Sequence, residues 1–455
     1  MRKKMEDFYQ DLKQEENRLK EIAGKAVDCA KSLGADECEA VIGVQKGLSV
    51  STRKVQVENI EFNKNRCLDI VVFKGKRKGN ASTTDLSMPA IKAAIEAAIN
   101  LAQYTDVDPC AGIADKEDLC VEEKELDLTY PLIEDADKAL DLALKAESLV
   151  FENKPAEIKD SDGAACETSL VIRALANSHG FNKTKSRSSN YLGLTLLGDD
   201  GIKMQRGSGY TTHLDFNKLK EPEWVVKEAM EQTLGKLHAQ KLTTGTYNVI
   251  FSKGAMLSLW GHLLGAIAGG AIYRKTSFLC DALGKEILPD FISIEEDPFI
   301  VGGKASANFD AEGVQTKISN LIKNGVLQEY LLSSYTARKL KLKTNGHAGG
   351  IYNLNINSQK EMYSLDEMMR NVGEGLVITD LMGQGVDLLS GNYSRGAAGF
   401  YFKDGKRQFA VEEVTIAGNL KDMFKKIALI GNDYDDRYKI KCGSVLIPEM
   451  TISGV

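Results

Sequence analysis

Residues 255–273 contain no charged side chain, and this stretch constrains the fold more than any other part of the sequence. Its 19 residues reach the minimum length of a transmembrane helix, with Lys253 and Arg274 at its flanks. However, glycine, serine, histidine and tyrosine dilute its apolar character, and no second stretch of this kind exists. We therefore expect a buried helix of a soluble protein, pressed against another backbone along its small residues Gly261, Gly265 and Gly269.

Length and charge limit the class of protein. The chain has 455 residues, more than one hydrophobic core usually organises, so two or three domains are expected. Its formal net charge of −6 opposes a nucleic-acid partner, because phosphate binding needs a concentrated positive surface. The densest basic cluster, residues 74–78, has the Lys-Gly pattern of an exposed hairpin turn. We expect neither a nucleic-acid nor a membrane partner.

The cysteines and the N-terminus indicate the compartment. Eight cysteines are scattered along the chain without a C-x-x-C pair, a spacing that favours reduced thiols over a disulfide framework. After Met1 the sequence continues into charged residues and has no apolar segment of a secretory signal. These features predict a cytoplasmic protein.

The first predicted domain comprises residues 1–112. Apolar residues recur at three- and four-residue intervals over 6–33, which predicts an amphipathic helix. From 39 to 83 the period changes to two, as in antiparallel strands, and a second helical pattern has its apolar residues between Ile91 and Ala102. An acidic linker is predicted over 113–128.

The second predicted domain, 129–241, repeats this order of elements. A helical pattern over 133–153 precedes strands over 161–210, and another helical pattern covers 224–237. The repetition concerns the architecture, since no clear sequence identity relates the two units.

The third predicted domain, 242–455, contains the uncharged stretch and the strongest hairpin signals. Asn324-Gly325 and Asp404-Gly405 each stand between apolar runs, and Asn-Gly supplies the two positive φ angles of a type I′ turn. Strands and helices come in blocks without βαβ alternation. The predicted fold class is therefore α+β, with antiparallel sheets and hairpins flanked by helices.

His262 lies at the centre of the uncharged stretch. A hydrolytic zinc site commonly uses two histidines about one helical turn apart and an adjacent glutamate that takes a proton from the bound water. Here Leu263 occupies the glutamate position, and the positions four and five residues after the histidine are Ala266 and Ile267. This helix alone cannot hold a catalytic zinc, and a hydrogen-bonded core imidazole is the simpler interpretation of His262.

Several sequence blocks occur in an order typical of a known family. They are DLS (85–87), DPCAG (108–112), GHL (261–263), AIAGG (266–270), HAGG (347–350), LMGQG (381–385), YSRGAAGF (393–400), IAGNLKDM (416–423) and CGS (442–444). Over nearly its whole length the chain resembles the TldD/PmbA family, specifically its PmbA (TldE) branch. The resemblance implies a cytoplasmic bacterial peptidase of two related subunits that admits unfolded or leader peptides to an enclosed cavity.

The resemblance also implies a division of labour. A TldD-type chain carries H-E-x-x-x-H and a C-terminal cysteine on zinc, and the PmbA-type chain pairs with it. Carried over by position, His262 matches the first histidine, Leu263 and Ile267 replace the glutamate and the second histidine, and Cys442 matches the cysteine. We expect no catalytic residue and no metal in this chain, with His262 and Cys442 as vestigial ligands and zinc in the partner. A heterodimer or larger complex is expected, and a homodimer is possible when the chain is alone.

Three further residues are candidates for peptide binding. His347 lies in a glycine-rich loop that can approach a peptide backbone, although the loop also fits a simple turn. Ser394 and Arg395 offer a hydroxyl and a guanidinium to a peptide carboxylate, although this segment also fits a turn into the next strand. A nucleophilic Ser394 is disfavoured, because G-x-S-x-G is absent around it.

Three functional hypotheses follow. The leading one is a non-catalytic but required subunit of a heteromeric zinc peptidase. The second is a regulatory protein-binding module of the DNA gyrase modulator type, acting by protein contact. The third is an autonomous metallopeptidase that uses His262, Cys442 and a distant ligand such as His347.

Overall fold

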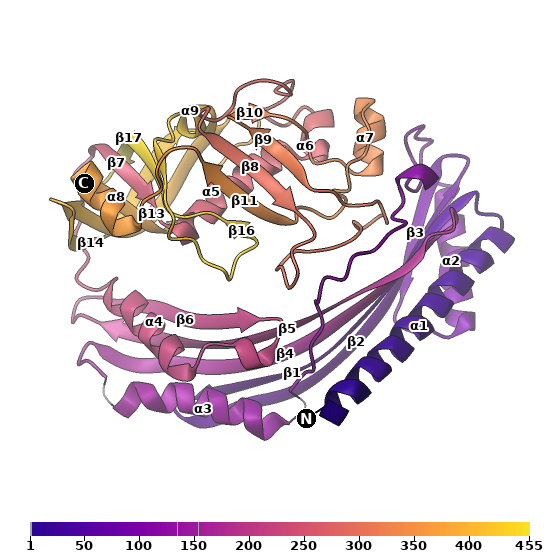
Figure 1. Ribbon diagram of the computed structural model, residues 1–455, viewed down its shortest axis with the longest axis horizontal. Coiled ribbons are helices and arrows are strands. Elements are labelled where there is room, and N and C mark those ends of the chain that lie inside the picture. Colours follow the sequence, from indigo (N-terminus) through magenta and orange to yellow (C-terminus); the bar gives the residue numbers. More distant parts are fainter. Residues whose placement is uncertain (1, 134, 153) are drawn as a thin grey trace.

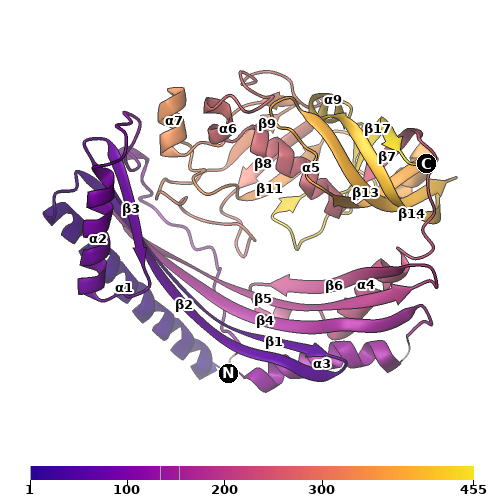
Figure 2. The ribbon, with the colours of Figure 1, turned by 180° about the vertical axis from the view of Figure 1, so that it is seen from behind.

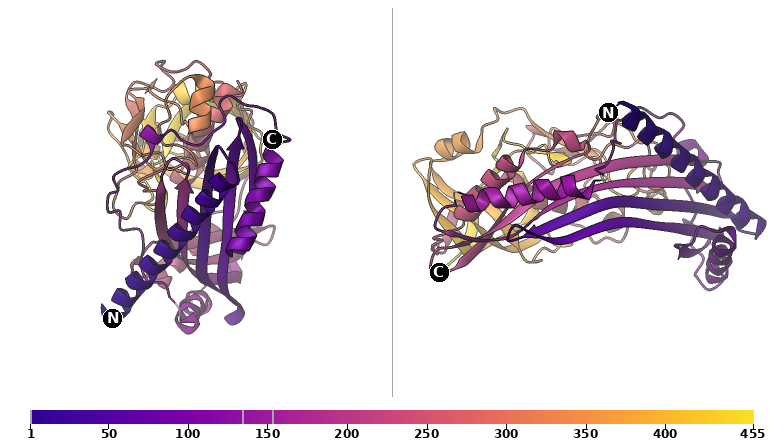
Figure 3. Two further views of the ribbon diagram at one scale, coloured as in Figure 1. Left: turned by 90° about the vertical axis from the view of Figure 1, so that its right-hand side faces the viewer. Right: turned by 90° about the horizontal axis from the view of Figure 1, so that it is seen from below.

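The computed structural model describes residues 2–133, 135–152 and 154–455. The chain forms two layers: a long curved sheet built by the first half, and a C-terminal domain that lies over the inner side of this sheet (Figure 1). Helices α1 (Arg2–Ser32) and α3 (Ala136–Glu152) run along the outer face of the sheet. Figures 2 and 3 show the same two layers from behind, from one side and from below.

The curved sheet has the strand order β3-β2-β1-β4-β5-β6, and every neighbouring pair is antiparallel. β1 pairs with β4 over a long register, from Glu39 opposite Asn177 to Thr52 opposite Ala164. The predicted domains 1–112 and 129–241 therefore contribute to one continuous sheet, while the boundary between them stays a prediction. The strands are β1 (Glu37–Arg53), β2 (Gln56–Lys74), β3 (Arg77–Thr83), β4 (Ile158–Asn177), β5 (Asn182–Asp199) and β6 (Met204–His213).

Alternating burial along β1 explains how helices cover this sheet. Even-numbered side chains from Cys38 to Val50 are buried on the helix side, with the exception of Lys46, as the period of two predicts. One core lies under α1 and α2 (Met88–Ala102), and a second lies under α3 and α4 (Pro222–Leu234). Burial of each large aliphatic side chain in these cores contributes about 1.5–3 kcal/mol.

The C-terminal domain contains two sheets around one large core. The first has the order β10-β9-β8-β11-β16, and the second β14-β13-β12-β7-β17-β15, which an extra pairing of β14 with β17 closes into a ring. The strands are β7 (Gly245–Phe251), β8 (Ile292–Asp297), β9 (Ser319–Lys323), β10 (Val326–Leu327), β11 (Asn353–Ser358), β12 (Glu374–Met382), β13 (Asn392–Lys403), β14 (Lys406–Asn419), β15 (Leu429–Ile430), β16 (Ile440–Lys441) and β17 (Val445–Ser453). The remaining helices are α5 (Lys253–Ala266), α6 (Gly269–Tyr273), α7 (Ser334–Leu340), α8 (Leu365–Val372), α9 (Leu420–Lys425) and the 3₁₀ turns Lys116–Asp118 and Phe216–Lys218.

Both predicted hairpin turns are confirmed. Asn324 and Gly325 have φ angles of 48° and 77°, and they connect β9 to β10. Asp404 and Gly405 have φ angles of 51° and 67°, and they connect β13 to β14. Two successive positive φ angles are the signature of the type I′ turn that the sequence predicted for Asn-Gly. β9 and β10, the strands of the Asn324-Gly325 hairpin, are shorter than the apolar runs that flank this turn in the sequence.

The uncharged stretch forms two short helices instead of one. α5 ends at Ala266, and α6 starts at Gly269 after a break in which Ala268 forms a bridge to Leu331. No helix in the described part of the chain combines the length and apolarity that a membrane crossing requires. The predicted close approach to another backbone is confirmed at Gly269, whose N–H donates a 2.8 Å hydrogen bond to the carbonyl of Leu331. It is wrong for the other two glycines, because a Cβ on Gly261 meets nothing within 4 Å and one on Gly265 meets a side-chain atom of Leu388.

Candidate functional site

Helix α5 positions His262, the first residue of the predicted vestigial site. Ser252 caps the helix by accepting a hydrogen bond from the backbone N–H of Ala255. Trp260 and Leu263 face the core, whereas His262 lies on a half-buried side of the helix. Its ring meets that of Tyr393 on β13 edge to face, with 6.0 Å between centroids. In the described structure, the imidazole Nε2 of His262 and the hydroxyl of Tyr393 are both buried without a hydrogen-bond partner.

Arg395 is the charged side chain that acts on this histidine. Its Nη1 donates a 2.6 Å hydrogen bond to the hydroxyl of Ser258, one helical turn before His262. Burial, and then the positive charge of Arg395, lower the pKa of His262. Burial also raises the pKa of Tyr393 to about 12, against a smaller opposing effect of Arg395. The imidazole and the phenol are therefore both neutral at physiological pH.

The residues at the family's zinc positions do not fit a zinc ion in this chain. Leu263 and Ile267 are each 1% exposed and belong to the main core, and neither carries a donor atom. Burial raises the pKa of the Cys442 thiol to about 12, so it stays protonated, and it donates to the carbonyl of Gly443 over 3.2 Å. Among the described residues, no three His, Cys, Asp or Glu side chains gather into a possible metal site.

His347 lies inside the C-terminal domain, where its side chain is only 2% exposed. Its Nε2 lies 2.6 Å from Oε2 of Glu296, and its Nδ1 lies 2.9 Å from Oδ1 of Asn345. The other Glu296 oxygen accepts a 2.6 Å hydrogen bond from the backbone N–H of Tyr352. Both ring nitrogens are thus occupied: the Nε2 contact ties the glycine-rich loop to β8, and the Nδ1 contact lies within the loop. The peptide-binding role of His347 stays a prediction that this geometry does not favour.

Ser394 and Arg395 point to opposite faces of β13. Ser394 is exposed and lines an open pocket of about 500 Å³, together with the loop that contains Gln384 and Asp387. Arg395 turns toward α5, as described above. Neighbouring residues of a regular strand alternate between its faces, so these two side chains do not converge on one carboxylate. Their individual peptide-binding roles remain predictions.

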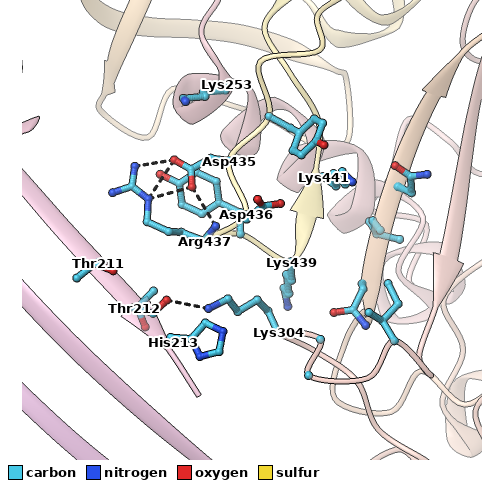
Figure 4. Close-up of a pocket in the computed structure, with 18 of the residues that line it drawn as sticks. Thr211, Thr212, His213, Lys253, Lys304, Asp435, Asp436, Arg437, Lys439 and Lys441 are labelled. Carbon is cyan, nitrogen blue, oxygen red and sulfur yellow. Dashed lines mark hydrogen bonds and ion pairs between the residues drawn. The ribbon is translucent and has the colours of Figure 1, made fainter. Parts of the chain in front are cut away.

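A cavity lined by charged side chains lies between the curved sheet and the C-terminal domain (Figure 4). It measures about 820 Å³, and charged side chains from both layers line it. Sequence reasoning missed this cavity, because its lining comes from segments far apart in the chain, such as Thr211–His213 on β6 and Tyr434–Lys441 before and within β16. A clustering of lysines and aspartates over 434–441 is the one local signal that the sequence offers.

Arg437 joins the two layers beside this cavity. Its Nη1 donates to the carbonyl of Tyr210 over 2.6 Å and to Glu228 over 2.8 Å, and its Nη2 donates to Glu228 over 2.7 Å and to Asp435 over 2.6 Å. Glu228 also accepts from the backbone N–H of Tyr210 over 2.9 Å. These contacts occupy outward-facing groups of β6, the edge strand of the curved sheet.

Three family profiles match consecutive parts of the chain. They are described as PmbA/TldA metallopeptidase domain 1 for residues 38–102, the central domain for 130–237, and the C-terminal domain for 244–454. The C-terminal profile thus covers α5, β13 and β16, which carry His262, Tyr393, Arg395 and Lys441.

Two curated PmbA relatives match nearly the whole chain. The Metalloprotease PmbA of Escherichia coli O157:H7 is 44% identical over 436 residues, which cover 96% of each chain. A Metalloprotease PmbA homolog of Haemophilus influenzae is 40% identical over 97% of this chain and 98% of its own. A Metalloprotease TldD homolog of Buchnera aphidicola is only 24% identical over 87% of this chain and 78% of its own.

Solved structures share the fold at lower identity. TldE from Thermococcus kodakarensis superposes with a TM-score of 0.81 and 20% identity, over 95% of this chain and all of the other. A Bacteroides thetaiotaomicron protein, described as a candidate modulator of DNA gyrase, gives a TM-score of 0.90 and 22% identity, over 96% and 99% of the two chains. These similarities support the fold alone, whereas the profiles and the full-length relatives identify the family. The chain belongs to the TldD/PmbA metallopeptidase family, in its PmbA (TldE) branch.

Proposed function

We propose that this chain is the non-catalytic subunit of a two-chain zinc peptidase, required for cleavage of unfolded or leader peptides by a TldD-type partner. The observation that carries the proposal is the packing of Leu263 and Ile267 in the main core, at the positions where the family's catalytic helix needs a glutamate and a histidine. Aliphatic side chains neither ligate a cation nor accept a proton from water. The catalytic centre then belongs to the partner.

The thiol of Cys442 supports the same conclusion. A cysteine binds zinc as a thiolate, and burial, which raises the pKa of Cys442 to about 12, adds to the cost of ionising this thiol. The thiol lies in an apolar setting, because Cys442 belongs to the same hydrophobic core as Trp260 and Phe424. The rings of Trp260 and Phe424 stack there with 6.1 Å between their centroids. In this proposal Cys442 is a core residue.

An exposed strand edge offers a place for the partner chain. β3 pairs with β2 from Leu68 onward, and no other strand of the described residues pairs with the outer edge of residues 56–66. Three apolar side chains on this edge are exposed, namely Val57 at 51%, Ile60 at 42% and Phe62 at 66%. Long apolar edges favour pairing with another chain. We assign residues 56–66, the β2 edge, to subunit contact.

Reconstitution with a TldD-type chain tests the proposal. Each chain alone is expected to leave an unfolded peptide intact, and the mixture is expected to cleave it. His262→Ala in this chain should leave cleavage by the mixture unchanged, whereas alanine at the first motif histidine of the partner should abolish it. Cleavage by this chain alone, lost on His262→Ala, would refute the proposal and favour the autonomous metallopeptidase.

The alternative of a regulatory protein-binding module makes a different prediction in the same experiment. It expects this chain to bind its target without any effect on peptide cleavage by the TldD-type chain. Similarity to candidate gyrase modulators at 22% identity concerns the fold and does not favour this alternative.

A further inference from the structure

The cavity between the two layers carries an excess of positive charge. Six lysines line it, contributed by the 3₁₀ turn after β6 and the residues that follow it, by the start of α5, by the loop after β8, and by the segment around β16. Figure 4 labels the four from the C-terminal domain. They are Lys218, Lys220, Lys253, Lys304, Lys439 and Lys441. The whole chain has a net charge of −6, so this concentration departs from its general surface.

The carboxylates of the cavity do not neutralise these lysines. Glu228 and Asp435 are bound to Arg437, as described above, which leaves Glu295, Asp297 and Asp436 as the remaining acidic groups of the lining. Within the described part of the chain, none of the six lysines forms an ion pair within 4.0 Å. With Arg437 and its two carboxylates included, the lining has seven cationic and five anionic side chains, so the cavity is positive by two charges.

Lys304 is the most enclosed of these cations. Its Nζ donates a 3.0 Å hydrogen bond to the carbonyl of Thr212 on β6, and its side chain is half-buried. Burial, and then the charge of Arg187, lower the pKa of Lys304, although Asp435 and Asp436 oppose this effect. An anion in the cavity would relieve this unfavourable placement of an ammonium group.

His213 adds a neutral hydrogen-bond donor to the same wall. Its Nδ1 accepts a 2.9 Å hydrogen bond from the backbone N–H of Asp215, which places the ring proton of the neutral imidazole on Nε2. Burial, and then the charges of Lys304 and Lys218, lower the pKa of His213 and favour this neutral form. The wall thus presents an N–H donor next to the Lys304 ammonium group.

The shape of the cavity favours an extended segment over a single small ion. A volume of about 820 Å³ is near the upper end of the range of ligand pockets, about 300–1,000 Å³. β16 ends its sheet, pairing with β11 on one side only, and Lys441 belongs to it. Its free edge can add an extended peptide by backbone hydrogen bonds, with Lys439 and Lys441 beside it.

We propose that this cavity binds an acidic segment of an extended peptide, whose carboxylates contact Lys304, Lys439 and Lys441. The inference rests on the proposed role in peptide handling and specifies the class of peptide: one with clustered Asp or Glu side chains. Peptide cleavage by the reconstituted mixture tests the proposed function, whereas peptide binding to this chain alone tests the acidic preference. A failure of the proposed function is therefore distinguishable from a failure of this inference.

Binding of a short fluorescein-labelled oligoglutamate peptide to the purified full chain tests this inference by fluorescence anisotropy. The double variant Lys439→Gln/Lys441→Gln is expected to weaken binding about tenfold or more, because it removes two charge-assisted contacts. A matched control is Lys421→Gln/Lys425→Gln, which removes two exposed charges on α9 outside the cavity and should change affinity less than about twofold. Thermal unfolding of each variant confirms that the fold is intact.

Three results would overturn the inference. The first is equal binding of oligoglutamate and a Gly-Ser peptide of the same length. The second is an equal loss of affinity in the two double variants, which would indicate general charge attraction. The third concerns competition against the labelled peptide. If inorganic tripolyphosphate displaces it at a concentration at least about tenfold lower than unlabelled oligoglutamate requires, the cavity is a phosphate site.

Discussion

Replacement of Arg437 by methionine tests how the C-terminal domain is held on the curved sheet. The guanidinium is 16% exposed and bridges two carboxylates from different layers, Glu228 at 18% and Asp435 at 9% exposure. The variant keeps most of the side-chain volume and removes every hydrogen bond of the guanidinium. It leaves two nearby carboxylates and the carbonyl of Tyr210 without their cationic partner.

The magnitude follows from this burial. Removing one partner of a buried ion pair costs about 3–5 kcal/mol, since the remaining charge is left uncompensated. Residual exposure of Glu228 places the expected loss at the lower end, about 3 kcal/mol in the free energy of unfolding. The matched control is Arg206→Met, which breaks the pair with Asp162 where the arginine is 64% exposed, and it should cost about 1 kcal/mol or less.

Urea unfolding monitored by tryptophan fluorescence measures both variants. The ring of Trp224 lies 5.4 Å from the Arg437 guanidinium and reports on the junction of the layers, whereas Trp260 reports on the C-terminal core. If the two variants lower the free energy of unfolding by amounts within about 1 kcal/mol of each other, the Arg437 network does not hold the layers together.

The same variant has a predicted pH dependence. Burial by itself raises the pKa of Asp435, but the hydrogen bonds and charge of Arg437 outweigh it and hold the pKa below its usual value. A depressed folded-state pKa stabilises the fold above the unfolded value of about 3.9, and this stabilisation is lost as pH falls through the folded value. The stability difference between wild type and Arg437→Met should therefore be full near pH 7 and narrow below about pH 4. A constant difference from pH 7 to pH 3 would contradict this assignment.

Three further substitutions probe the fold and the subunit contact. Gly325→Ala should destabilise the protein in urea unfolding by at least about 2 kcal/mol more than the control Gly284→Ala. Both glycines have positive φ, but only a Cβ at position 325 would lie 2.2 Å from the carbonyl oxygen of Leu288. Leu263→Ala should cost about 2–5 kcal/mol in the same assay, since its side chain is 1% exposed in the core, and a loss under about 1 kcal/mol would show that the core does not depend on it. Phe62→Ser should leave the free energy of unfolding within about 0.5 kcal/mol and weaken binding to the TldD-type chain about tenfold, measured by calorimetry; unchanged affinity would remove the β2 edge from the proposed contact.

Local features of the fold were predictable from the sequence. The turns at Asn324-Gly325 and Asp404-Gly405 were predictable, because their geometry depends on the two turn residues themselves. The amphipathic helices α1, α2 and α4 were also predictable, since one apolar stripe against a sheet gives a regular period.

Long-range features were not predictable. The pairing of β1 with β4 joins residues more than a hundred positions apart, and no local signal fixes that register. The break after Ala266 depends on the bridge from Ala268 to Leu331, another tertiary contact. The glycines of α5 suggested close backbone packing, but Gly261 faces open space and Gly265 faces the side chain of Leu388.

The candidate site shows the same limit. The substitution of Leu263 and Ile267 for a glutamate and a histidine was readable in the sequence, because it concerns which donor atoms exist. The burial of His347 against Glu296 was not readable, since His347 lies in a loop and its partner lies 51 residues away on β8. The lysine-lined cavity likewise depends on the placement of the C-terminal domain over β6.

The metal content of each chain in the reconstituted complex tests the central claim most directly. Native mass spectrometry of the separated subunits is expected to find zinc on the TldD-type chain and none on this one, both before and after His262→Ala. About one zinc per copy of this chain, lost on His262→Ala or Cys442→Ala, would contradict the account.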